Sequence, residues 1–498
     1  MADPFVRVDV WTLTADDPII TAYAAAVTAM QQKPQSDPTS WMYQANIHGL
    51  LAQTTIAQWD QCRHGSWYFL PWHRMYVYYF EQIVRAYVIA NGGPATWALP
   101  YWNYDRGGDT NFLPPAFRDA TSSLYVSQRA PGLNDGTTGL PTGPTGVTTP
   151  ADALSQATFT GGSEFGGGVT SVAVNWPNFW NQTGRLEQTP HNDVHNTIGG
   201  LMGDPATAAQ DPIFWLHHAN IDRLWWLWVQ TQPHADPTDA SWTSQNFLIN
   251  GLPGFFDAQG NPIPLGSALT CATVEDTVAQ LGYTYDALAL TPAPVVAPAV
   301  KEAAAVTWPA PWPQGPPTAA AVGPTPDRQL VGATDQPVTL VGNPVTVPVA
   351  IDDRVMASLQ PGKSVAPQQH RAFLDIEDMD AERNPGKVYG VFVNLPAQPT
   401  QADLDAHHAG NISLFGVERA RDPRGDEHPH GLSSSMDITG LLDRFAADGT
   451  WTDGTQLTVT FRPLTLQAAP GRQLPAAAAD TSHPDLPITI GRISVHYA

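Results

Sequence analysis

The chain has 498 residues, 14% of them charged, and its 46 acidic against 24 basic side chains give a formal net charge of −22. This length is enough for roughly two to four domains with a large core, and the acidic balance argues against nucleic acid or an anionic membrane surface as a partner. Only two cysteines occur, Cys62 and Cys271, which excludes a disulfide framework.

Neither the basic n-region nor the apolar h-region of a signal peptide is present in the first residues, MADPFVRVDV. No run approaches the roughly 18 apolar residues that a membrane span needs. We therefore expect a soluble protein in the cytoplasm, unless it is exported by a route that the sequence does not reveal. Its oligomeric state stays open.

Helical patterns are predicted over residues 20–30 and 41–51, and His48 lies near the end of the second. A lone histidine at such a place is usually an ordinary surface or core residue. Pro71 fits a helix only in the first turn, so a further helix is predicted to begin near residue 70.

His73 falls in the first turn of that helix, and His64 lies nine residues earlier. On one continuous helix the two rings would point in different directions, so His64 is predicted to lie on the preceding loop. The result is a triad of imidazoles among aromatic residues. On its own, such a triad could be a structural zinc site or a coincidence.

The stretch from residue 191 to residue 228 holds a second group of histidines. His191 and His195 are four residues apart and share one face of a helix. Asp211, followed by proline, is typical of a helix start, and that helix carries His217 and His218. Sites made of imidazole alone suit copper, zinc, iron or nickel, and the carboxylates that magnesium or calcium needs are missing. Two such triads make coincidence a poor explanation.

The spacings H-(x15)-H-(x8)-H and H-x3-H-(x22)-H, with the phrases FLPWHRMYVYYFE and DPIFWLHHANIDRLWWLW, resemble the type-3 copper family over residues 5–286. This family comprises tyrosinases, catechol oxidases and molluscan haemocyanins. Because neighbours on a helix differ by about 100°, only one of His217 and His218 can face a metal, and the resemblance assigns that role to His218. It also implies that Phe214 stacks beside the ligand rings. The resemblance thus implies two copper ions, held by His48, His64 and His73 and by His191, His195 and His218.

Cys62 lies two residues before His64. Taken alone, it is a buried free thiol, the usual state of a lone cysteine. Fungal and molluscan members carry the same C-x-H spacing, and the resemblance implies a thioether between Cys62 and His64. Such a bond would tether the one ligand that is predicted to lie on a loop.

Glu187 precedes His191 by four residues, and Asn192 follows that histidine directly. Taken alone, Glu187 is a carboxylate near a helix start. The resemblance implies that Glu187 and Asn192 hold a water that deprotonates an incoming phenol. Asn196 stands where some members have arginine, so we expect no grip on a substrate carboxylate. Spacing places an open mouth above the metals near residues 204–206.

The end of the first domain, residues 242–286, resembles the plant enzymes' closing segment with its Tyr-x-Tyr motif. The resemblance implies that Tyr283 and Tyr285 pack against Arg7, a cation–π contact worth about 0.5–2 kcal/mol. Cys271 is predicted to be a core thiol. Residues 287–328 are rich in proline and alanine and are predicted to form a protease-sensitive linker.

Short alternating segments over residues 329–498 predict about seven strands and a β-sandwich. The resemblance implies that this domain covers the copper site and inserts a side chain into it. Tyr389 and Phe392 are the candidates, unless both are ordinary strand core. His428 and His430 could bind stray copper, but a solvated loop is favoured.

These observations predict a mainly α catalytic domain over residues 1–286, with a four-helix bundle around a dinuclear copper site, and a C-terminal β-sandwich. The resemblance implies an oxidase that converts o-diphenols, and also monophenols, to o-quinones with O2, latent until the C-terminal domain is removed. A haemocyanin-like reversible O2 carrier and an o-aminophenol oxidase on the same scaffold stay open as alternatives.

Overall fold

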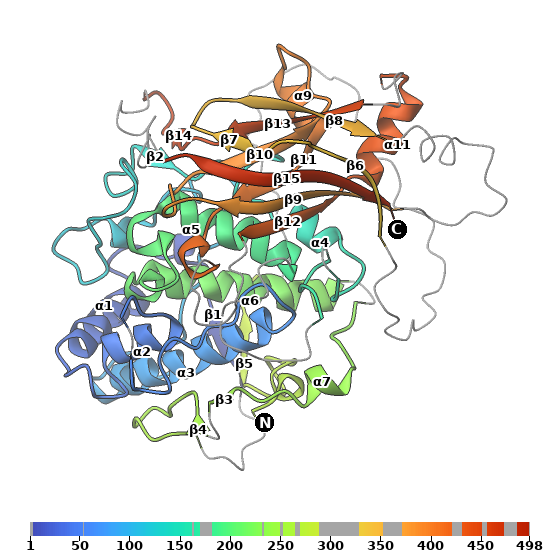
Figure 1. The fold of residues 1–498 in the computed structure, drawn as a ribbon. Coiled ribbons are helices and arrows are strands. Elements are labelled where there is room, and N and C mark those ends of the chain that lie inside the picture. The colour runs from blue at the N-terminus through green and yellow to red at the C-terminus, as the bar shows by residue number, and fades with distance from the viewer. Residues whose placement is uncertain are drawn as a thin grey trace.

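The computed structural model describes a helical part, residues 3–287, and a β-rich C-terminal part, residues 328–497, each with gaps (Figure 1). No helix in these described stretches is long and apolar enough to cross a membrane. The described residues are 3–52, 54–161, 164–169, 182–231, 234–249, 252–263, 269–287, 328–351, 371–420, 431–450, 456–472 and 486–497. Most of the predicted linker, residues 287–328, lies outside the described residues, and so do both His428 and His430.

Four helices form the body of the helical part. Asp17 caps helix α1 and Ser40 caps helix α2. Each side chain accepts a hydrogen bond from a backbone amide in the first turn of its helix. Helix α3 begins at Phe69, which confirms the predicted helix start near residue 70. The third and fourth helices pack against each other, with several fully buried tryptophans in the core around them. These helices are α1 (Pro18–Gln31), α2 (Trp41–His48), α3 (Phe69–Ala90) and α6 (Ile213–Thr231).

Shorter elements complete the helical part. A segment of π-helical hydrogen bonding, η4, leads directly into α5. These elements are η1 (Val10–Thr12), η2 (Pro115–Phe117), α4 (Ala151–Ser155), η4 (Glu187–Asn192), α5 (Asp193–Ile198), η5 (Gly200–Gly203), η6 (Ala208–Gln210), α7 (Ala240–Thr243), η7 (Cys271–Thr273) and the short strands β1 (Phe5–Arg7), β2 (Thr138–Gly139), β3 (Leu248–Ile249), β4 (Leu252–Pro253) and β5 (Tyr283–Tyr285).

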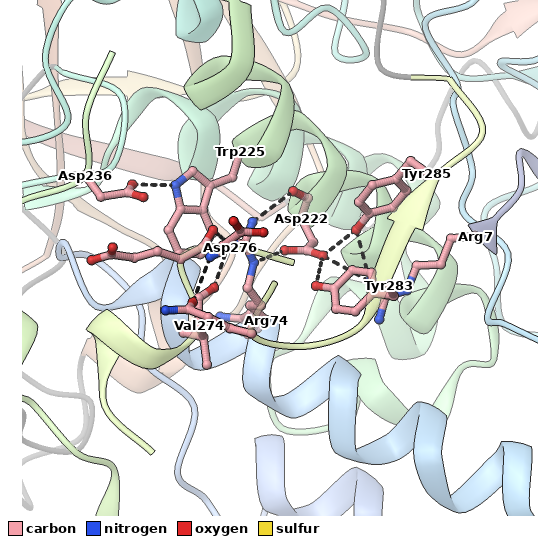
Figure 2. A network of polar contacts seen from close by, with 12 residues as sticks. Arg7, Arg74, Asp222, Trp225, Asp236, Val274, Asp276, Tyr283 and Tyr285 are labelled. Atoms are coloured by element: carbon pink, nitrogen blue, oxygen red, sulfur yellow. Dashed lines mark hydrogen bonds and ion pairs between the residues drawn. The ribbon is translucent and has the colours of Figure 1, made fainter. Parts of the chain in front are cut away.

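The two ends of the helical part meet where β1 pairs with β5 in parallel. The Arg7 guanidinium lies 3.9 Å from the centre of the Tyr283 ring, which confirms the predicted cation–π contact. Figure 2 shows Asp222 of α6 between Arg7 and Arg74, where it also accepts hydrogen bonds from the hydroxyls of Tyr283 and Tyr285. This buried network links β1 to β5 and to α6, the helix that carries His217 and His218.

The C-terminal part has its own hydrophobic core and one hydrogen-bonded network of nine strands. The strand order is β11-β10-β13-β8-β6-β15-β9-β12, with β7 paired to β15, and the end strands β11 and β12 also contact each other. The sheet is thus nearly closed, and the two separate layers of a sandwich are not confirmed. The strands are β6 (Gln329–Ala333), β7 (Val338–Leu340), β8 (Val345–Ile351), β9 (Ala372–Asp380), β10 (Val388–Val393), β11 (His408–Ser413), β12 (Leu432–Asp437), β13 (Gln456–Pro463), β14 (Gln467–Ala468) and β15 (Ile488–Tyr497).

The described residues of the C-terminal part also include the short helices α9 (Gln401–His407), α10 (Val417–Ala420) and α11 (Thr439–Ala447). The C-terminal part contacts the helical part at several places. Strand β14 pairs with β2, and Val388 and Leu466 belong to the hydrophobic core of the helical part. Strands β10 and β11 lie against α5, and β11 also lies against η4. This packing places the loop after β11 over the second group of histidines.

Candidate metal centre

The first group of histidines comes from α2, the following loop and α3. His48 ends α2, His73 lies in the first turns of α3, and His64 lies on the loop between them, as predicted. One nitrogen from each ring lies within 4.8 Å of the others, and all three rings are buried. The His48 and His73 Nε2 atoms are 3.4 Å apart. For metal–nitrogen bonds of about 2.0–2.1 Å in a tetrahedral arrangement, two ligand nitrogens lie about 3.3 Å apart.

The second group comes from η4, α5 and α6. His191 and His195 have ring centres 4.6 Å apart, and His218 of α6 brings its Nε2 to 3.3 Å from that of His195. His217 belongs to the same cluster, although both of its ring nitrogens have no hydrogen-bond partner among the described residues. The separation of the His195 and His218 nitrogens again fits two ligands of one metal ion.

Backbone and side-chain oxygens hold the opposite nitrogen of most of these rings. The Nδ1 atoms of His48, His73 and His195 lie 2.8 Å from the carbonyl oxygens of Pro205, Phe69 and Met202. The His191 Nδ1 lies at the same distance from the Asn192 side-chain oxygen. A proton on Nδ1 satisfies each contact, so the Nε2 lone pair is left for a metal.

The two groups face each other. The rings of His73 and His218 stack at 4.6 Å with an interplanar angle of 12°. Burial lowers the pKa of His48 to about 3 and lowers the pKa of the other rings well below the usual value, and neighbouring imidazoles add to the effect for several of them. The rings are therefore neutral, which is the state that binds metal.

Phe214 lies where the resemblance predicts, with its ring 4.1 Å from the His218 ring and 4.9 Å from the His48 ring. Glu187 is buried beside the groups, and both of its carboxylate oxygens accept a hydrogen bond from the Gly65 amide. Burial raises the pKa of Glu187 well above its usual value, although the Gly65 amide opposes this. Cys62 is a fully buried free thiol in the structure.

A side chain of the C-terminal part covers the second group, and it is neither of the two that the sequence suggests. Phe415 stacks on His195 at 4.3 Å and 22°, and its ring centre lies 5.7 Å from that of His191. Tyr389 instead packs in the β-rich core and accepts a hydrogen bond from the Gly342 amide. Phe392 lies beside His408. The prediction of Tyr389 or Phe392 is therefore wrong, because both belong to a strand that the fold buries along its whole length.

The mouth predicted near residues 204–206 is closed in this chain. Pro205 and Ala206 are buried. The amide of Asn384, from the C-terminal part, donates to the carbonyl oxygen of Gly203 at 2.7 Å. Asn411 of β11 donates to the carboxylate of Asp193 at 2.9 Å. The C-terminal part thus covers the groups with polar contacts around one apolar ring.

Comparisons with known proteins agree with this arrangement. Residues 38–231 match the profile described as the common central domain of tyrosinase, and residues 327–498 match a domain of unknown function (DUF7868). Tyrosinase HcTyr1 from Hahella sp. (strain CCB-MM4) is 31% identical over 96% of this chain and 97% of its own length. The chain belongs to the tyrosinase family. As in that family, its two histidine groups fit a dinuclear copper site.

Two further comparisons cover most or all of this chain. (+)-Larreatricin hydroxylase from Larrea tridentata is 25% identical over 87% of this chain and 72% of its own length. The solved structure of latent apple tyrosinase superposes with a TM-score of 0.62 at 22% identity and covers 100% of this chain and 98% of that one. The shared fold therefore includes the helical part and the β-rich C-terminal part together.

Proposed function

We propose that this tyrosinase-family chain is a latent copper oxidase that converts o-diphenols, and also monophenols, to o-quinones with O2. Two o-diphenols are oxidised for each O2 that is reduced to two waters. The observation that carries the proposal is the pair of facing groups of neutral imidazoles, covered by Phe415. The names of relatives, tyrosinase and polyphenol oxidase, support the same chemistry.

The proposed ligands of the first copper are His48, His64 and His73, and those of the second are His191, His195 and His218. Four helical segments, α2, α3, η4–α5 and α6, would then surround the pair as the predicted bundle. His217 would lie beside the second copper without binding it. The separate core of the C-terminal part supports a division into a catalytic domain over residues 1–286, a linker over 287–328 and a covering domain over 329–498.

The copper pair, when bound, supplies the redox chemistry that takes electrons from the phenol and passes them to O2. The residues of the chain hold the ligands, exclude water and guide the substrate ring. Carbonyl oxygens fix the imidazoles through Nδ1, and Phe214 packs against the His218 ring. Glu187 and Asn192 are proposed to hold the water that takes the proton from a monophenol hydroxyl. The burial of Glu187 beside the loop that carries His64 supports this role.

Phe415 supports latency because it occupies the place where a substrate ring would stack on His195. An apolar ring pressed against a copper-binding imidazole excludes both substrate and bulk water. Cys62 is proposed to form the thioether with His64, because it precedes that ligand by two residues and is fully buried. The bond would fix the one proposed ligand that lies on a loop.

The test is an assay of the copper-loaded full chain, before and after a cut within residues 287–328. We expect two copper ions per chain, little O2 uptake by the intact chain, and rapid O2 uptake with 4-methylcatechol and slower uptake with 4-methylphenol after the covering domain is released. One metal ion per chain, or no oxidation of either phenol in any state, would overturn the proposal. Reversible O2 binding without turnover would instead favour the carrier, and turnover of o-aminophenol alone would favour the aminophenol oxidase.

A further inference from the structure

Two polar side chains of the C-terminal part reach the rim of the copper site. The Arg419 guanidinium of α10 pairs with both carboxylate oxygens of Asp60, at 3.0 and 2.7 Å, and donates to the Leu50 carbonyl oxygen at 2.6 Å. The Asn384 amide nitrogen donates to the side-chain oxygen of Asn196 and to the Gly203 carbonyl oxygen, both at 2.7 Å. A cation and an amide of the covering part are thus held by acceptors of the catalytic part.

The Asp60 acceptor lies next to the first histidine group, whereas Asn196 directly follows His195 of the second group. The backbone amide of Asp60 donates to the Asn46 carbonyl, and the amide of Cys62 donates to the His48 carbonyl, so this segment runs along the end of α2. On the other side, Asp204 directly precedes Pro205, whose carbonyl oxygen contacts the His48 ring. Burial raises the pKa of Asp204, the nearby Asp60 adds to the rise, and Arg419 opposes it. Asp60, Asp204 and Arg419 therefore share one small region at the rim.

The Asp60 carboxylate loses its cationic partner when the covering part leaves. Arg419 leaves with that part, and so does Glu418, which accepts a hydrogen bond from the Asn384 backbone amide at 2.6 Å. The carboxylates of Asp60 and Asp204 stay. Arg63, which follows Cys62 in the catalytic part, is buried.

Asn196 adds an observation of its own. Its side chain is only 1% exposed, and its amide nitrogen has no hydrogen-bond partner among the described residues. A buried polar group without a partner is destabilising. In the closed chain the oxygen of this amide accepts from Asn384, so this oxygen is the acceptor that becomes free when the covering part leaves.

We propose that the open enzyme selects phenols that carry an ammonium group on their side chain. The rim subsite that binds this group consists of the carboxylates and oxygen acceptors contributed by Asp60, Asp204, Asn196 and Gly203. In the closed chain, Arg419 and Asn384 occupy it. The proposal rests on the proposed phenol oxidation and names the substrate class that the same site prefers.

The physical reason is charge complementarity. An ammonium group offers hydrogen-bond donors to the two oxygen acceptors and is attracted by two carboxylates, whereas a substrate carboxylate is repelled by them. Clefts lined by one sign of charge change association rates by about tenfold or more. Because the rim is open to solvent once uncovered, salt at about 1 M, where the Debye length is about 3 Å, should remove most of the preference.

The test keeps the full copper-loaded chain and opens it by substitution. In a Phe415→Ala background, kcat/KM is measured for 4-methylcatechol, dopamine and 3-(3,4-dihydroxyphenyl)propionate, which carry no charge, an ammonium and a carboxylate. Arg419→Gln should raise the ratio of dopamine to dihydroxyphenylpropionate by about tenfold at low salt, since it frees Asp60. Adding Asp60→Asn, or Asp204→Asn, should return the ratio most of the way to the value measured for the Phe415→Ala chain. Asp119→Asn is the matched control, because it removes an exposed carboxylate that only needs to accept hydrogen bonds from Thr121.

Each result decides one point. A dopamine preference that appears with Arg419→Gln, falls with Asp60→Asn and fades in salt supports the rim subsite. Oxidation of 4-methylcatechol with no charge preference, or a preference that Asp60→Asn and Asp204→Asn leave unchanged, overturns it while the proposed function stands. No oxidation of 4-methylcatechol overturns the proposed function itself. If a carboxylate variant fails to fold, the salt dependence of the Phe415→Ala/Arg419→Gln chain still decides, because a ratio that salt leaves unchanged excludes charge selection.

Discussion

Replacing Phe415 with alanine removes the ring that covers the second histidine group and leaves the rest of the covering part in place. Phe415 is 1% exposed, and its ring lies within 6 Å of the rings of His195, His191 and His64. Truncating a fully buried phenylalanine costs about 3–5 kcal/mol. Because this ring packs against the catalytic part and not within the β-rich core, most of that loss falls on the closed arrangement.

A loss of about 3 kcal/mol corresponds to a shift of about 100-fold in the equilibrium between closed and open chains. We therefore expect the uncut Phe415→Ala chain to oxidise 4-methylcatechol at least tenfold faster than the uncut wild type at equal copper content. The assay is O2 uptake together with quinone absorbance, with copper measured on the same samples.

The matched control is Phe392→Ala, which truncates a buried phenylalanine of the same covering part whose ring lies beside His408. Phe392→Ala should lower the melting temperature of the covering part without raising the rate of the intact chain as much. If Phe415→Ala and Phe392→Ala raised the rate equally, or if neither did, the closed state would not depend on the Phe415 ring and the reasoning would fail.

Three further predictions concern the catalytic part. Glu187→Gln should reduce hydroxylation of 4-methylphenol at least tenfold more than oxidation of 4-methylcatechol, since only the monophenol needs the proton-accepting water; equal losses of both rates would remove Glu187 from that role. The intact mass of wild-type chain after copper loading and aerobic turnover should be lower by the mass of two hydrogens, and Cys62→Ala should abolish this difference, whereas an unmodified wild-type mass would contradict the thioether. For Asp222, burial alone would raise the pKa, but Arg74 and Arg7 outweigh it and hold the pKa below its usual value. Its contribution to stability is therefore present above about pH 4 and is lost as the pH falls through the lower folded value, so the stability difference between wild type and Asp222→Asn in calorimetry should shrink on acidification in that range.

The helical part could be predicted from the sequence because its signals are local. Pro71 marks the start of α3, and the spacing of His191 and His195 places both rings on one side of a helical turn. The break inside η4 could not be foreseen, because it depends on the backbone turning at Thr189, whose φ and ψ leave the helical region. This break changes the helix type and still leaves the two rings 4.6 Å apart.

The side chain that covers the second histidine group could not be predicted from the sequence. Local hydrophobic periodicity does not indicate which loop contacts which helix in the folded chain. Phe415 lies between the end of β11 and the short helix α10, and Gly416 after it adopts a positive φ of 89° that turns the chain. The apolar run of β10 correctly predicts a buried strand, and both Tyr389 and Phe392 look attractive from the sequence because all of its residues are buried. Strand β12, Leu432–Asp437, gives only a weak strand signal because its serines interrupt the apolar alternation. The number of strands predicts a β-rich fold, but the pairing that makes one nearly closed sheet comes from tertiary contacts.

The boundary between the two parts explains why a closed chain of this kind can open without unfolding. Each part has its own hydrophobic core, so separating the parts leaves most of the buried apolar surface of each one covered. Much of the boundary near the copper site is polar, and water can replace its hydrogen bonds and ion pairs at little cost. These contacts are Arg371–Glu164, Arg419–Asp60, Asn411–Asp193 and Asn384–Asn196. Phe415 is the residue of the covering part whose large apolar ring contacts the second group of histidines. Closure at the site therefore depends on one aromatic side chain, whose place an aromatic substrate ring can take.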